Sequence, residues 1–244
     1  MLQALIHKKL KASFSDTNFS PSEDTLTSSV LGLLQYLPSN IFLSILKEAC
    51  GMSSSFPIKA EDIIEVRFWE HWEASNTTNA RLVEPDVFIA TESYHIIVEA
   101  KKTDEGGQYL EQWNKELIAH QNTFPDDDHR LVLYALGGND SLTEKTIILN
   151  NTIIPIYRAS WFNLLHAITN ELSQKHSYHI NRLLSDIINA FRIHGFFDIE
   201  WIDTLDSCSL SSKTISIFSH SNAFSKLYTN HKPLNNKFIE IWPA

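Results

Sequence analysis

Cysteine, glycine and proline are all scarce in this 244-residue chain, with counts of 2, 7 and 8. Two cysteines cannot build a disulfide framework, which favours a reducing compartment. No apolar run approaches the ~20 residues that a membrane-spanning helix needs. The N-terminal stretch MLQALIHKKLKASF lacks the long apolar core of a signal peptide. We therefore expect a cytoplasmic protein with no membrane partner.

Positive charge is scarce as well. The chain has 20 Lys and Arg against 29 Asp and Glu, a formal net charge of −9. A protein that coats nucleic acid relies on Lys and Arg for backbone contacts, so this balance argues against that class. It leaves room for an enzyme that holds metal with carboxylates and contacts nucleic acid through a local basic groove.

The order of hydrophobic patterns predicts an α/β fold. Apolar residues recur at helical spacing from Ser20 to Pro38 and again over 39–50, 105–121, 159–172 and 178–194. Strand-like runs occupy 62–72, 85–90, 94–101 and 130–138, with TIILN and IIPIY as further strands. We expect a central mixed sheet flanked by helices. Residues 1–158 would form this core, and residues 159–244 a helical and mixed C-terminal extension packed on it.

Three charged residues stand at the ends of two apolar runs in EPDVFIATESYHIIVEAKK, residues 84–102. Glu99 and Lys101 project from the same face of their strand, because side chains alternate. The polar turn TES predicts a hairpin, which would bring Asp86 close to that strand end. Charged side chains rarely occupy such positions unless they are paired, bound to metal or engaged in chemistry.

This set of residues suits phosphodiester hydrolysis. Two carboxylates can hold Mg²⁺, a hard cation that prefers oxygen ligands. The ion can polarise a phosphoryl oxygen and acidify a bound water. Lys101 can orient or help to deprotonate that water, and it can stabilise charge in the transition state.

The segment Pro85-Asp86 to Glu99-Ala100-Lys101 resembles the PD-(D/E)XK nuclease superfamily, which has the restriction-endonuclease-like fold. The resemblance covers roughly residues 20–140 by the order of expected elements. It implies that Asp86 and Glu99 bind a divalent metal and that Lys101 is catalytic.

The same resemblance implies two helical contributors. A Glu on the first helix often joins the metal site in this superfamily, and here it would be Glu23. A Gln on the helix after the second motif strand often assists catalysis, and Gln112 is the candidate, with Gln108 as the alternative one turn earlier. Glu23 has a competing interpretation, because it lies three residues after Ser20 and could complete a helix-capping box.

The expected function is a Mg²⁺-dependent nuclease, with Mn²⁺ as an alternative ion, acting on DNA in restriction, repair or defence. Cutting both strands of a duplex favours a homodimer, and the acidic charge favours reliance on a partner subunit. Two other classes stay open. One is a catalytically silent nuclease fold that binds nucleic acid or protein, and the other is a Mg²⁺-dependent hydrolase of smaller phosphoesters.

Other polar and glycine-rich segments have simpler interpretations. FPDDDH, residues 124–129, follows the second motif strand and is typical of a solvated loop. His176 and His179 lack the Cys or further His that would complete a zinc pattern. LGGND, residues 136–140, holds an isolated glycine pair rather than a phosphate-binding loop.

Overall fold

A six-stranded mixed sheet forms the centre of the protein, in a computed structural model that describes residues 21–51, 54–56, 61–78, 81–103 and 106–197. The expected α/β class, with a mixed sheet flanked by helices and a helical C-terminal part, is confirmed. The strand order is β1-β4-β5-β6-β8-β7. The strands are β1 (Ile63–Phe68), β4 (Val87–Thr91), β5 (Tyr94–Ala100), β6 (Arg130–Leu136), β7 (Lys145–Leu149) and β8 (Thr152–Ala159).

The pairing directions bring particular strand ends together. β4 and β5 form the expected antiparallel hairpin, with Val87 opposite Val98. β5, β6 and β8 run parallel, whereas β1 and β7 are antiparallel edge strands. The start of β4 therefore lies beside the carboxyl ends of β5 and β6, at the edge of the sheet formed by strand ends. The charged residues singled out in the sequence lie at this edge.

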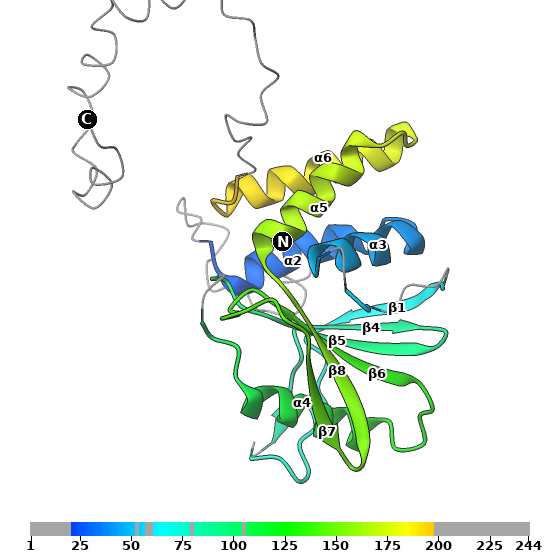
Figure 1. Ribbon diagram of the computed structural model, residues 1–244, viewed down its shortest axis with the longest axis vertical. Coiled ribbons are helices and arrows are strands. Elements are labelled where there is room, and N and C mark those ends of the chain that lie inside the picture. The colour runs from blue at the N-terminus through cyan, green and yellow to red at the C-terminus, as the bar shows by residue number, and fades with distance from the viewer. Residues whose placement is uncertain (1–20, 52–53, 57–60, 79–80, 104–105, 198–244) are drawn as a thin grey trace, which may run out of the picture. The chain divides into compact units, whose positions relative to one another are not determined.

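Helices cover both faces of the sheet (Figure 1). The helices α2 (Glu23–Leu34), α3 (Ser39–Ala49), α5 (Trp161–Ser173) and α6 (Tyr178–Ile193) lie on one face, and α4 (Leu110–Thr123) lies on the other. The short strands β2 (Trp72–Glu73) and β3 (Leu82–Val83) form a separate two-stranded sheet that packs against α4. Within β5, Ile96 and Val98 face the four-helix layer, whereas Ile97 faces α4. β5 is buried along most of its length, as expected for a strand with both faces covered.

The start of α2 differs from the expectation. Its cap is Ser22, whose Oγ accepts a hydrogen bond from the Thr25 backbone N–H at 3.2 Å. Thr25 Oγ1 in turn accepts one from the Ser22 backbone N–H at 2.8 Å, which closes the capping box. The capping role predicted for Glu23 is therefore wrong: Glu23 is the first helical residue, and its carboxylate is available elsewhere. Ser20, the predicted cap, lies outside the described residues.

Three further boundaries were predicted imperfectly. The strand expected over 62–72 is interrupted at Trp69, whose φ of 46° is incompatible with extended backbone. α3 ends at Ala49, one residue before the expected end, and Pro38 occupies its N-cap position. α4 begins only at Leu110, five residues after the expected start at residue 105, and its N-cap residue Tyr109 is exposed. None of the helices in the described ranges is long and apolar enough to cross a membrane.

The apolar stripe expected on the last helix is confirmed. α6 packs against α2 and α5. Its stripe residues are buried or packed against the core and comprise Ile180, Leu183, Leu184, Ile187, Ile188 and Phe191. The expected mixed structure of the last fifty residues falls almost wholly outside the described residues.

The glycine pair after β6 has a specific structural role. Gly137 and Gly138 both have positive φ, of 69° and 63°. A Cβ atom on Gly137 would lie 2.2 Å from the carbonyl oxygen of Lys101, and one on Gly138 would lie 2.8 Å from the Lys101 Cβ. Only glycine permits this close approach of the two backbones, so the loop sets the position of Lys101.

Substituting Gly137 by alanine should destabilise the protein more than the same change at Gly106. Gly106 has nearly the same φ, 71°, but a Cβ atom added there would meet no heavy atom of the described residues within 4 Å. Gly106→Ala should lower the free energy of unfolding by about 1–2 kcal/mol, because alanine is strained in the left-handed backbone conformation. Gly137→Ala should cost about 1–3 kcal/mol more, because the backbones must move apart. Urea denaturation of both variants measures the difference, and equal losses would contradict the close-approach argument.

Candidate active site

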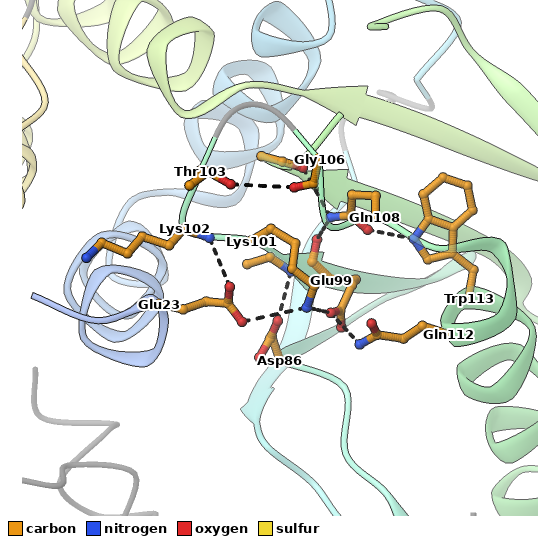
Figure 2. Close-up of polar contacts among 12 residues, drawn as sticks. Glu23, Asp86, Glu99, Lys101, Lys102, Thr103, Gly106, Gln108, Gln112 and Trp113 are labelled. Carbon is orange, nitrogen blue, oxygen red and sulfur yellow. Dashed lines mark hydrogen bonds and ion pairs between the residues drawn. The ribbon is translucent and has the colours of Figure 1, made fainter. Parts of the chain in front are cut away.

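Asp86, Glu99 and Lys101 lie together at one edge of the sheet (Figure 2). Asp86 immediately precedes β4, and its Oδ2 accepts a hydrogen bond from the Ala100 backbone N–H at 2.8 Å. Its Oδ1 accepts a second one from the Trp69 indole N–H at 3.1 Å. The Lys101 ammonium group forms an ion pair with the carboxylate of Glu99. The hairpin therefore brings the three predicted residues together.

The two helical candidates also reach this group. Glu23 Oε1 lies 3.6 Å from Nζ of Lys101, and Glu23 Oε2 accepts a hydrogen bond from the Lys102 backbone N–H at 2.9 Å. From the other side of the sheet, the Gln112 side chain on α4 donates to Oε1 of Glu99 at 2.5 Å. Oε1 of Glu99 thus accepts hydrogen bonds from both Lys101 and Gln112.

Gln108, the alternative to Gln112, has a different environment. Its amide donates to the carbonyl oxygens of Glu99 and Gly137, at 2.9 and 3.2 Å. Its own oxygen accepts a hydrogen bond from the Trp113 indole at 2.7 Å. Gln108 therefore connects the backbones at the ends of β5 and β6, and of the two glutamines only Gln112 hydrogen-bonds to the Glu99 carboxylate.

Sequence reasoning missed Glu116. It lies one helical turn after Gln112 on α4 and is 1% exposed, and its carboxyl group interacts electrostatically with that of Glu99. Its Oε2 atom is buried and has no hydrogen-bond partner among the described residues. The i, i+4 spacing from Gln112 is the signal in the sequence, and it becomes informative only once the inward face of α4 is known.

Burial and, after it, the neighbouring charge of Glu99 determine the electrostatics of this site. Burial, followed by the charge of Glu99, raises the pKa values of both Asp86 and Glu116 well above their usual range. Burial alone would lower the pKa of Lys101, but the carboxylates of Glu99, Glu23 and Asp86 outweigh it and raise that pKa. The lysine is therefore held in its charged form, while the carboxyl groups of Asp86 and Glu116 resist ionisation.

The donor set fits a hard divalent cation. The groups around Glu99 offer carboxyl oxygens, the ligands that Mg²⁺ and Mn²⁺ accept. The buried Oε2 of Glu116, which has no hydrogen-bond partner among the described residues, is a further oxygen that such an ion could bind. The Lys101 and Glu23 side chains are 20% and 34% exposed, so the group is open to solvent on their side.

Comparisons with known proteins give one relative and no family. No family model matches the chain. The protein is similar to "Uncharacterized protein PM0110" of Pasteurella multocida (strain Pm70), with 27% identity over 228 residues. That match covers 84% of this chain and 85% of the relative. The similarity therefore extends over most of both proteins, and the relative's name describes no activity.

Replacing Glu116 by glutamine should stabilise the metal-free protein, and increasingly so as pH rises. The folded-state pKa of Glu116 lies above its ordinary value of 4.5, so wild-type stability is fullest below that value and falls as pH rises toward the folded pKa. Glutamine does not titrate. The melting temperature of Glu116→Gln should exceed that of wild type by about 2–4 °C for each kcal/mol gained. The gap should widen as pH rises above 4.5 in EDTA.

Glu111→Gln is the matched control, because Glu111 lies on the exposed side of the same helix. A hydrogen bond from Lys115 lowers the pKa of Glu111, so removing its charge should bring no gain at higher pH. If the difference in melting temperature between Glu116→Gln and wild type stayed constant with pH, the ionisation of Glu116 would not be what destabilises the wild type.

Proposed function

We propose that this protein is a divalent-metal-dependent nuclease that hydrolyses phosphodiester bonds, with DNA as its substrate. The observation that carries the proposal is the meeting of Asp86, Glu99 and Lys101 at one sheet edge, joined by Glu23 and Gln112. Residues from separate segments of the chain thus surround the end of β5 at Glu99 and Lys101. A fold that merely bound nucleic acid would not need three buried or half-buried carboxyl groups around a lysine.

The carboxyl groups supply the proposed metal-binding function. Asp86 and Glu99 would hold Mg²⁺ or Mn²⁺, with Glu23 at the solvent side and the free Oε2 of Glu116 as a further oxygen. When bound, the ion would polarise a phosphoryl oxygen and lower the pKa of a water molecule. Hydrogen bonds from Ala100 and Trp69 fix the orientation of Asp86 before any ligand arrives.

Lys101 would act as a fixed positive charge. Its raised pKa keeps the ammonium protonated, which favours stabilising negative charge on the phosphoryl oxygens over abstracting a proton. The Gly137–Gly138 loop packs against its aliphatic part and limits its movement. Gln112 would position the carboxylate of Glu99 through its hydrogen bond and is therefore a positioning residue.

The proposal extends to setting and partners. We retain the cytoplasm as the location, on the strength of the low cysteine content. Restriction, repair or defence is the proposed context. With a net charge of −9, DNA binding would depend on local cations near the site or on a partner subunit.

Lys101→Met should abolish most cleavage, whereas Lys102→Met should not. Loss of the charge next to the scissile group should reduce the cleavage rate by about 10²–10⁴-fold. Lys102 is adjacent in sequence, but its ammonium group contacts the carbonyl oxygen of Pro21 instead. The measurement is cleavage of labelled duplex DNA, single-stranded DNA and RNA with Mg²⁺, Mn²⁺ or EDTA.

The same assay separates the proposal from its rivals. Asp86→Asn and Glu99→Gln should lose activity together with Lys101→Met, and EDTA should silence the wild type. Cleavage of nucleotides or small phosphoesters in preference to polymers would point to a smaller substrate. DNA binding without cleavage under any metal would overturn the nuclease proposal in favour of a silent binding module.

The two glutamines should behave differently when each is changed to alanine. Gln112→Ala should lower the cleavage rate at nearly unchanged stability, because it removes one donor from Glu99. Gln108→Ala should destabilise the fold by about 1–3 kcal/mol, because two backbone carbonyl groups and the Trp113 indole lose their partner. Cleavage rates and urea denaturation curves test both, and equal effects on stability would contradict the assignment.

A further inference from the structure

A second polar cluster lies at the opposite end of β5. His95 stands near the start of that strand and Glu99 near its end, and both side chains face α4. His95 meets His120, from the last turn of α4, and Asp127, from the loop that precedes β6. The segment 124–129 was expected to be a solvated loop, but its central aspartate is only 15% exposed.

The three side chains offer more lone pairs than protons. Nδ1 of His95 lies 2.9 Å from Nε2 of His120 and 2.8 Å from Oδ2 of Asp127. A single N–H proton on His95 can serve only one of these acceptors. Oδ2 of Asp127 is in fact buried and makes no hydrogen bond of regular geometry with any described residue, although the His95 nitrogen is close. One positive centre among the three atoms would satisfy all of them at once.

The surroundings hold these groups in place. His95 and His120 are 7% and 4% exposed, and the rings of Phe88 and Phe124 pack against both. His129 stacks on His95 with ring centres 4.3 Å apart, and its Nδ1 pairs with Oδ1 of Asp127. The pairing with His129 orients Asp127 through Oδ1. Its Oδ2 is then left on the side of the His95 and His120 imidazoles.

Both imidazoles are neutral under ordinary conditions. Burial lowers the pKa of His95, and burial together with the neighbouring His95 lowers the pKa of His120 to about 4. Neutral imidazole is the form that ligates metals, because the ring nitrogen must keep its lone pair. At neutral pH the cluster therefore presents two neutral nitrogens and one carboxylate.

We propose that His95, His120 and Asp127 form a binding site for a divalent transition metal of the Zn²⁺ class. The candidate ligand atoms all lie within 4.8 Å of one another. A tetrahedral ion with bonds of 2.0–2.1 Å separates its ligands by about 3.3 Å. The two pairs that include His95 Nδ1 would therefore move apart by about 0.5 Å, whereas the third pair lies at most 4.8 Å apart before the ion binds. Two imidazoles and a carboxylate suit Zn²⁺, whereas the carboxyl groups around Glu99 suit Mg²⁺.

The site has an entrance and a structural consequence. An open pocket of about 860 Å³ is lined in part by His120, Asp127 and His129, which gives an ion a path from solvent. The ion would join β5, the end of α4 and the following loop, three segments that are otherwise held here by ring packing and hydrogen bonds. This inference does not depend on the proposed nuclease activity.

Zinc titration of the full-length protein tests the site. The chain would be stripped with a chelator and titrated with Zn²⁺ by calorimetry, in the presence of Mg²⁺ to occupy the carboxylate group. Wild type should bind one Zn²⁺ per chain. The affinity should fall by at least about tenfold in Asp127→Asn and His120→Gln. His166→Gln, which changes an exposed histidine on α5, should bind like wild type.

Co²⁺ provides a spectroscopic readout of the same site. Wild type loaded with Co²⁺ should show the visible absorption of tetrahedral coordination, and Asp127→Asn should not. Should His120→Gln fail to fold, the loop variant Asp127→Asn still decides the question. Absence of Zn²⁺ binding by folded wild type would overturn the proposal. Binding that is lost in Glu99→Gln but kept in Asp127→Asn would also overturn it, because the ion would then belong to the carboxylate group.

Discussion

Repulsion among carboxyl groups at one edge of the sheet is the constraint on which the rest of this site depends. Asp86, Glu99 and Glu116 are buried around a shared centre, with Glu23 at the rim and Lys101 as the cation among them. One ammonium group cannot neutralise so many carboxylates. The arrangement is therefore stable only with protons retained on some carboxyl groups or with a further cation bound.

The scaffold that holds these groups is rigid for identifiable reasons. The β4–β5 hairpin fixes Asp86 beside the end of β5, and the short turn between the two strands sets their register. Gly137 and Gly138 allow the backbone after β6 to approach Lys101 closely. α4 lies on the face of the sheet opposite the other four helices. Its first half adds Gln112 and Glu116 beside the end of β5. The hairpin, α2 and α4 thus bring polar groups to the cluster around Glu99 and Lys101.

Much of this arrangement was predictable from local patterns. Alternating and helical hydrophobic periods located the sheet and the helices, and the hairpin followed from a polar turn between two strand-like runs. The start of α2 was misplaced because several Ser and Thr residues compete for the cap. Glu116 escaped notice because its importance depends on which face of α4 turns inward. The cluster of His95, His120 and Asp127 draws on distant segments, so no sequence spacing could reveal it.

The most direct test of the central claim is a Mn²⁺ titration of wild type and Glu99→Gln, followed by electron paramagnetic resonance of the free ion. If the carboxyl groups form a divalent-metal site, wild type should take up Mn²⁺ and release protons as the raised carboxyl pKa values fall. Glu99→Gln should bind much more weakly. Equal Mn²⁺ uptake by the two proteins, or none by a correctly folded wild type, would contradict the account.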